Sequence, residues 1–271
     1  MSQLEAEQPI GIFDSGVGGL TVAHSIKSLL PNENIIYFGD TFHLPYGDKS
    51  SESVKYYAHR ISDFLMEKNC KTVLIACNTA SASAFNEVVE HVAGRAIVLN
   101  VVDPVVSYVS EKHGEGRIGV IGTKGTINSH TYETKIKQKN ASLEVISMAT
   151  PLFVPMIEEG FIYDDISNAI IRAYLSDERF NDIHTMILGC THYPIIKRQI
   201  EKFFNFGINI IDAADIVAQK LKSTLEDMGL MHKGKPDRHE FYISDYTPYF
   251  EKISKMFFES AVHLEHLNFW K

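Results

Sequence analysis

Two of the three cysteines in this 271-residue chain lie in closely similar surroundings. Cys77 lies in residues 76–82 (ACNTASA) and Cys190 in residues 189–194 (GCTHYP), and each follows an apolar run typical of a buried strand. The residues after each run predict a helix start, where the helix dipole favours a thiolate. A free cysteine is more often an inert buried residue, as we expect for Cys70. Because Cys77 and Cys190 form a matched pair, we interpret them as functional.

Two thiols on opposite sides of one site suit the racemisation of an acid at its α-carbon. One group removes a proton from one face of the carbon, and the other returns a proton to the opposite face. A thiol with a pKa near 8.5 can act as either acid or base, and Asp14 and His192 are expected to tune the two thiols. A cysteine hydrolase would need only one nucleophile and one base, so it would leave the second cysteine unexplained.

The sequence predicts neither a metal nor an organic cofactor. Cys77, Cys190 and His192 give at most three zinc ligands, without a Cys-x-x-Cys pair. No lysine lies in a motif suited to pyridoxal phosphate. We therefore expect the reaction to proceed without a cofactor.

Residues 14–19 (DSGVGG) follow the first apolar run and resemble a phosphate-binding loop. The dinucleotide pattern requires glycine at position 21, where the chain has Thr21, and the Gly-Lys-Ser/Thr of a P-loop is absent. Backbone N–H groups in such a turn can still hold a carboxylate. Asp14 could instead be a plain helix cap.

Polar side chains near these motifs are candidates for holding a substrate without any arginine. Residues 45–47 (PYG) form a turn that could be structural, and residues 151–160 could be an ordinary helix start with acidic residues at its dipole. The candidate hydroxyl and amide donors are Ser15, Tyr46, Asn78, Thr79, Thr123 and Thr191.

An internal repeat indicates how these residues are positioned. Residues 10–16 (IGIFDSG) resemble residues 118–124 (IGVIGTK), 108 positions later, and residues 73–79 (VLIACNT) resemble residues 186–192 (MILGCTH), 113 positions later. Two motif pairs in the same order predict two related lobes. Ligands bind beyond the carboxyl ends of strands in open α/β sheets, so both cysteines would line one cleft between the lobes.

The whole chain reads as an α/β protein with mostly parallel sheets flanked by helices. Continuous apolar runs alternate with amphipathic helical segments. The expected strands are residues 10–13, 35–38, 72–76, 96–102, 117–121, 143–148, 185–188 and 208–211.

Composition argues against a nucleic-acid partner and a membrane location, and favours the cytoplasm. The net charge is −8, and no cluster of Lys and Arg indicates a nucleic-acid surface. No apolar run approaches the roughly 18–20 residues that cross a membrane, and the polar N-terminus does not resemble a secretory signal. With three cysteines, the expected compartment is the reducing cytoplasm.

Taken together, the motifs resemble those of bacterial glutamate racemases, from about residue 9 to residue 215. The resemblance implies two pseudo-symmetric lobes with the active site in the cleft between them. Residues 1–101 and 213–271 would form the first lobe and residues 102–212 the second. It further implies a small-molecule substrate, L- or D-glutamate, and a role in supplying D-glutamate for peptidoglycan; a homodimer is left open.

By the same resemblance, Cys77 and Cys190 are the paired acid and base, with Cys77 taking the proton from D-glutamate. Asp14 and His192 are their helpers, and Glu158 is a third carboxylate near His192. The implied substrate contacts are Asp14, Ser15, Pro45, Tyr46, Gly47, Cys77, Asn78, Thr79, Thr123, Cys190, Thr191 and His192.

Two departures from the family pattern stand out. Residues 101–105 (VVDPV) replace the usual Ile-Glu-Pro-Gly at the crossing between lobes, and the chain beyond about Ala214 matches weakly. Two alternatives also remain open: a related racemase acting on aspartate, and a protein that binds glutamate without turning it over.

Overall fold

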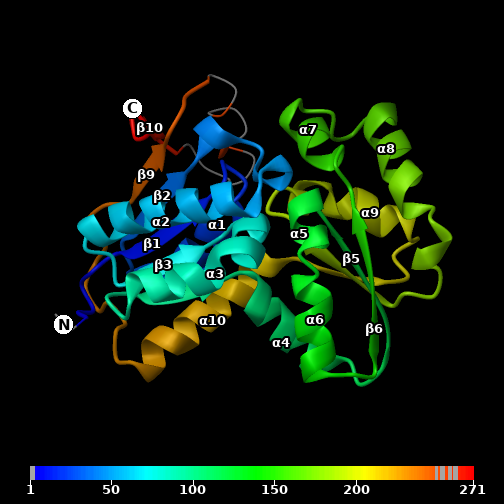
Figure 1. Ribbon diagram of the computed structural model, residues 1–271, viewed down its shortest axis with the longest axis horizontal. Helices are drawn as coiled ribbons and strands as arrows, with labels where there is room; N and C mark the ends of the chain where they lie inside the picture. Colours follow the sequence, from blue (N-terminus) through cyan, green and yellow to red (C-terminus); the bar gives the residue numbers. More distant parts are fainter. Residues whose placement is uncertain (1–3, 248–249, 251–253, 256–257, 259–261) are drawn as a thin grey trace.

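Two parallel β-sheets, each flanked by helices, form the framework of the computed structural model, which describes residues 4–247, 250, 254, 255, 258 and 262–271 (Figure 1). The six-stranded sheet has the order β10-β9-β2-β1-β3-β4, and the four-stranded sheet has the order β6-β5-β7-β8. The predicted α/β class is confirmed. The strands are β1 (Ile10–Asp14), β2 (Ile35–Gly39), β3 (Thr72–Ile75), β4 (Ile97–Asn100), β5 (Gly116–Gly122), β6 (Leu143–Ala149), β7 (Thr185–Gly189), β8 (Asn209–Ile211), β9 (Glu240–Ile243) and β10 (Glu265–His266).

The two sheets repeat one topology. The order β2-β1-β3-β4 in the first sheet matches β6-β5-β7-β8 in the second, and all neighbouring strands are parallel. The pairs of similar motifs therefore follow equivalent strands: β1 and β5 in one case, β3 and β7 in the other. This confirms the pseudo-symmetric pair of lobes predicted from the internal repeat.

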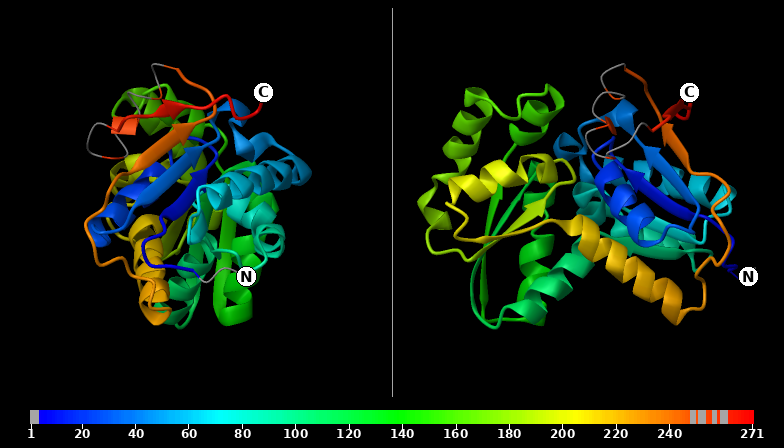
Figure 2. Two further views of the ribbon diagram at one scale, coloured as in Figure 1. Left: turned by 90° about the vertical axis from the view of Figure 1, so that its left-hand side faces the viewer. Right: turned by 180° about the vertical axis from the view of Figure 1, so that it is seen from behind.

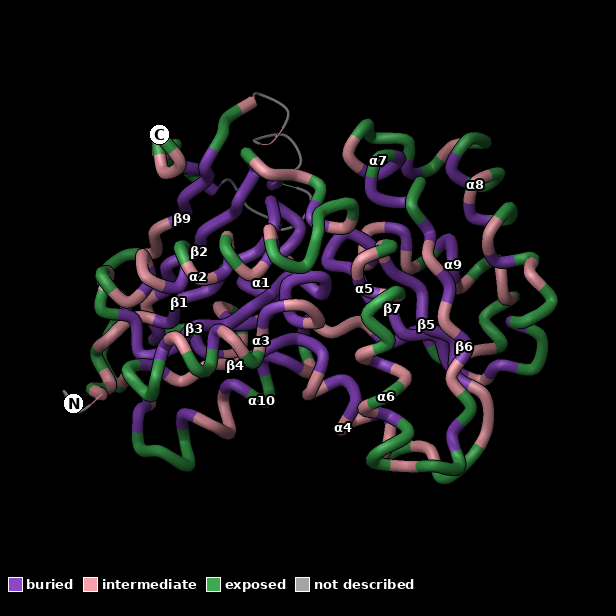
Figure 3. Tube along the Cα trace, in the orientation of Figure 1, coloured by how far each residue is buried: buried purple, intermediate pink, exposed green. Residues whose placement is uncertain are grey.

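Helices cover both faces of the first sheet because its strands are apolar on both sides. Ile10 and Ile12 of β1 pack with α1 (Leu20–Leu29) and α10 (Ala213–Asp227). Phe13, one residue further on, points to the opposite face and packs with α2 (Ser51–Glu67) and α3 (Asn78–Val92). All five residues of β1 are buried, which is the pattern of a central parallel strand (Figure 3).

The second sheet is covered in the same way. Val120 of β5 packs with α4 (Val102–Lys112) and α6 (Thr131–Lys139). Ile121 points to the other face, toward α7 (Phe153–Glu158), α8 (Asp165–Leu175) and α9 (Lys197–Phe203). The short helix α5 (Lys124–Asn128) begins directly after β5, on the side that faces the first sheet.

The C-terminal part of the chain returns to the first sheet. β9 pairs with β2, and β10 pairs with β9 in turn, so residues far apart in sequence lie side by side (Figure 2). The chain passes between the sheets at β4 to α4 and again at β8 to α10. The boundaries expected at residues 101/102 and 212/213 stay a prediction. Over the part of the chain that is described, no helix is both long and apolar enough to cross a membrane.

Candidate active site

Cys77 lies between β3 and α3, at the N-cap position of that helix. Its sulfur accepts a hydrogen bond from the backbone N–H of Ala80, at 3.4 Å. Burial raises the pKa of the Cys77 thiol to about 12, and the negative charge of Asp14 adds to the increase. The Ala80 N–H and the Ser15 hydroxyl oppose it. The helix start therefore offers the thiolate partners, as expected, but burial outweighs them.

Cys190 follows β7 directly and has different partners. Its sulfur lies 3.9 Å from Nδ1 of His192, and Nε2 of His192 lies 3.0 Å from Oε1 of Glu158. Burial alone would lower the pKa of His192, but the hydrogen bonds to Cys190 and Glu158 raise it well above its ordinary value. An imidazolium 3.9 Å from the sulfur is a favourable neighbour for negative charge there.

Asp14, the last residue of β1, is fully buried beside both cysteine segments. Its Oδ2 accepts the backbone N–H groups of Gly16 and Gly19, at 3.0 and 3.1 Å, and its Oδ1 accepts the hydroxyl of Thr191 at 3.4 Å. Burial raises the pKa of Asp14, whereas the charge of His192 and the backbone N–H groups lower it. Asp14 thus joins the first sheet to the Cys190 segment as well as acting on Cys77.

One narrow cavity between the lobes brings the predicted residues together. It holds about 350 Å³ of empty space, part of it open to solvent. Of the predicted site residues, Asp14 and Glu158 do not line it, but both contact residues that do. The lining residues are Ser15, Leu44, Pro45, Tyr46, Gly47, Cys77, Asn78, Thr79, Thr123, Val154, Gly189, Cys190, Thr191 and His192.

Hydroxyl groups of the two lobes meet at this cavity. Thr79 in α3 and Thr123, the N-cap of α5, lie 2.8 Å apart between their oxygens, and Thr126 lies 3.2 Å from Thr79. Tyr132 of α6 donates to Oδ1 of Asn78 at 2.7 Å. These contacts cross between the lobes, so residues that face the cavity also hold the two lobes in place.

Three lining residues were not predicted from the sequence: Leu44, Val154 and Gly189. Leu44 directly precedes the singled-out Pro45, and Gly189 is the first residue of the 189–194 motif that carries Cys190. Val154 belongs to the short helix α7, which lies within residues 151–160 and carries Glu158, but only Glu158 was singled out there. No group of three His, Cys, Asp or Glu side chains among the described residues is placed to hold a metal ion.

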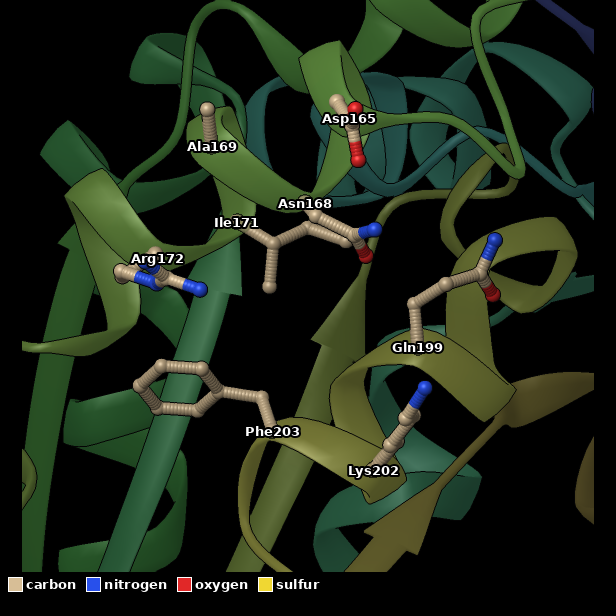
Figure 4. Close-up of a pocket in the computed structure, with 8 residues that line it drawn as sticks. All are labelled: Asp165, Asn168, Ala169, Ile171, Arg172, Gln199, Lys202 and Phe203. Carbon is tan, nitrogen blue, oxygen red and sulfur yellow. The ribbon is translucent and has the colours of Figure 1, made fainter.

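A larger cavity lies elsewhere, in the groove between α8 and α9 (Figure 4). It holds about 1140 Å³ of empty space, and its lining includes Arg172, Gln199 and Lys202 but no cysteine. Size alone therefore does not identify the reactive site in this molecule. The chemistry of the side chains does.

Two repeated α/β lobes that bring one strand-end cysteine each to a shared cavity define a class of enzyme: the amino-acid racemases, which are isomerases. Comparison with known proteins gives the family. Residues 19–221 match the family model described as Asp/Glu/hydantoin racemase. The chain belongs to this family.

Individual relatives match over nearly the whole chain. A glutamate racemase of Chlorobaculum parvum is 42% identical over 260 residues, which is 95% of each protein. The crystal structure of glutamate racemase from Francisella tularensis in complex with D-glutamate superposes with a TM-score of 0.91 at 39% identity, covering 98% of this chain and 99% of that one. A glutamate racemase structure from Bacillus anthracis gives a TM-score of 0.91 at 32% identity, covering 97% and 98%.

Proposed function

We propose that this enzyme interconverts L- and D-glutamate without a cofactor, using Cys77 and Cys190 as the acid and base. One observation carries the proposal: cysteines at equivalent positions of the two repeated sheets line the same cavity. The relatives named above support glutamate as the substrate.

The proposed reaction moves one proton at a time. As a thiolate, Cys77 takes the α-proton of D-glutamate, and the electron pair of the broken C–H bond stays on the substrate, delocalised into its carboxylate. The Cys190 thiol then donates its proton to the opposite face, which gives L-glutamate. Cys77 ends as a thiol and Cys190 as a thiolate, and the reverse reaction exchanges the roles.

The two thiols have different charged neighbours during the proposed reaction. Because burial and Asp14 hold the pKa of Cys77 at about 12, the ammonium group of the substrate is needed beside it to favour the thiolate. On the other side, His192, held by Glu158, supports negative charge on Cys190. Each thiol therefore has a partner suited to its half of the reaction.

The substrate carboxylates would be held by neutral donors. Hydroxyls of Ser15, Thr79, Thr123 and Thr191 and the amide of Asn78 line the cavity, and no arginine or lysine does. Each hydrogen bond to a charged group is worth about 1.5–3 kcal/mol, so a few of them can bind a dicarboxylate. Pro45, Tyr46 and Gly47 line the same cavity, and Gly47 lies against Thr123.

We further propose that the product, D-glutamate, is supplied for peptidoglycan synthesis in the cytoplasm. The names of the relatives support D-glutamate as a product, and the resemblance of the motifs supports the role in peptidoglycan synthesis. For this role, the enzyme must form D-glutamate from L-glutamate at neutral pH.

The deciding experiment is proton NMR of the purified protein in deuterated water, with L- and D-glutamate supplied separately and no cofactor added. We expect the α-proton signal to disappear from both enantiomers while circular dichroism of each solution converges on zero. Exchange with aspartate but not glutamate would keep the mechanism and change the substrate. Binding of glutamate without any exchange would refute the enzyme proposal and leave a binding protein.

A further inference from the structure

The C-terminal end of the chain lies beside the loop that carries Tyr46. β10 pairs with β9, β9 pairs with β2, and β2 ends at Gly39, immediately before Asp40. The ring of Phe269 packs on Phe38 of β2 with centroids 4.7 Å apart. This places Trp270 over the segment that leads from β2 to the cavity.

Asp40 is a fully buried carboxylate at the centre of this region, and four side chains are bonded to it. Its Oδ1 accepts the Ser244 hydroxyl and the Trp270 indole N–H, both at 2.7 Å. Its Oδ2 accepts the Tyr46 hydroxyl at 2.7 Å and lies 2.8 Å from Nδ1 of His43. A buried carboxylate is tolerated only when its oxygens are bonded, and bonds to a charged oxygen are strong and directional.

Aromatic packing runs along the same path as the hydrogen bonds. The Trp270 ring meets His43 edge-on at 4.6 Å, and His43 stacks on Tyr57 at 3.9 Å. Tyr57 in turn lies 5.5 Å from the ring of Tyr46. Trp270 and Tyr46 are thus joined twice, once through Asp40 and once through these rings.

We propose that Trp270 is a positioning residue for the reaction: through Asp40 it holds the Tyr46 side chain, and with it residues 45–47, against the substrate. The proposal rests on the proposed function in so far as Pro45, Tyr46 and Gly47 contact glutamate. Trp270 itself does not line the cavity.

The expected consequence is an effect on binding and not on proton transfer. Without the indole N–H, Oδ1 of Asp40 keeps only the Ser244 hydroxyl, so the carboxylate that bonds Tyr46 through Oδ2 is less firmly held. The cavity wall then loosens around the substrate. Cys77 and Cys190 belong to other segments, β3–α3 and β7–η4 (Tyr193–Ile196), and neither is bonded to Asp40.

Steady-state kinetics of Trp270→Phe test the proposal, because phenylalanine keeps an aromatic ring but has no N–H donor. The phenyl ring is also smaller than the indole, so lost packing against His43 and Tyr57 must be separated from the lost hydrogen bond by the controls that follow. We expect KM for both enantiomers to rise roughly tenfold and kcat to stay within about twofold. Tyr56→Leu is the matched control: its exposed ring packs on the same indole at 6.2 Å, but no hydrogen bond joins it to Asp40, so KM should not change. An unchanged KM in Trp270→Phe overturns the proposal.

A double-mutant cycle separates positioning from general stability. Tyr46→Phe removes the hydroxyl that Asp40 holds, so adding Trp270→Phe to it should raise KM no further. Additive effects of the two substitutions on KM would mean that Trp270 acts by another route. A fall in melting temperature with additive kinetics would identify a merely structural role.

A spectroscopic readout keeps this test independent of turnover. Trp270 is the single tryptophan of the chain, so intrinsic tryptophan fluorescence reports on this position alone. We expect Tyr46→Phe to change the emission of Trp270, whereas Cys70→Ala should not. Wild-type protein that fails to racemise glutamate would refute the proposed function, whereas identical emission spectra for wild type and Tyr46→Phe would refute the positioning role.

Discussion

At the scale of single residues, the two candidate catalytic cysteines are equivalent in topology but not in electrostatics. Cys77 has a carboxylate, Asp14, as its charged neighbour, whereas Cys190 has an imidazole that is itself held by Glu158. The repeat positions the sulfurs, and the charged side chains beside them differ between the lobes. This difference allows each half of the reaction to be tested separately.

We expect Cys77→Ala and Cys190→Ala each to lower the rate of racemisation by at least about 1,000-fold, the loss typical of a missing general acid or base. The fold should remain intact, because both substitutions only shorten a small side chain. Circular dichroism at 220 nm and the racemisation assay give the two readouts. Cys70→Ala is the control: that thiol is buried beside Gly11 and does not line the cavity, so the activity of this variant should be that of wild type.

The raised pKa of His192 predicts how activity changes with pH. A raised pKa keeps the imidazolium up to a higher pH, so activity that needs the imidazolium falls only as pH rises through that pKa. Glu158→Gln removes one of the contacts that raise the pKa and should move the alkaline limb of the kcat/KM profile to lower pH. The neighbouring Glu159→Gln, which changes an exposed carboxylate, should leave the profile in place; a profile unmoved by Glu158→Gln would contradict the assignment.

At the scale of elements, the loop of residues 14–19 packs directly on the segment that carries Cys190. Gly18 has no room for a side chain: a Cβ there would lie 2.6 Å from Oγ1 of Thr191 and 2.6 Å from Nδ1 of His192. The glycine is therefore required by the close approach of the two lobes. The sequence only partly matched a phosphate loop. In the structure the N–H groups of Gly16 and Gly19 bond to Asp14, and Gly18 allows the close packing.

We predict that Gly18→Ala lowers kcat/KM by roughly 100-fold, since a displacement of about 1 Å at a reactive centre has an effect of that size. The displaced groups would be Thr191 and His192, next to Cys190. Gly114→Ala is the matched control, because a Cβ at Gly114 has nothing within 4 Å. Equal kinetics for the two variants would show that the 14–19 loop does not set the position of His192.

The sequence was sufficient to locate most elements, because buried parallel strands are continuous apolar runs. All eight expected runs are strands, from β1 to β8, with small differences at their ends. β9 and β10 were missed: β10 has only two residues, both exposed, and β9 lies in the region beyond Ala214 where the motifs give little guidance. Trp270 and Asp40 were missed as partners because 230 positions separate them, and only the tertiary fold brings them together.

At the scale of the whole molecule, one buried ion pair ties together distant parts of the first sheet. Nζ of Lys71 lies 2.6 Å from Oε2 of Glu33 and also donates to the backbone carbonyls of Ala6 and Leu230. Both charged side chains are almost completely buried. The N-terminal lead, the loop before β2 and the end of the α10 segment therefore meet at a single ammonium group.

We expect Glu33→Gln to lower the free energy of unfolding by about 3–5 kcal/mol, because it leaves a buried ammonium without its counter-charge. Replacing both partners with apolar residues, Lys71→Met with Glu33→Leu, should lower stability less. Urea denaturation followed by circular dichroism measures both. The kcat of the folded variants should be unaffected, since the pair does not contact the cavity; a single variant as stable as wild type would contradict the prediction.

The two passages of the chain between the sheets have a mechanical consequence. Two rigid bodies joined at two points rotate most easily about the axis that passes through both points, which is a hinge motion. In this protein the two hinge points are the turns before α4 and α10. These two helices pack against each other. The easiest motion is therefore a swing that parts Thr79 from Thr123 and Asp14 from Thr191, whereas sliding or twisting of one lobe on the other would strain both connections. We expect access to the cavity to depend on this swing, and therefore on the stiffness of the turns before α4 and α10.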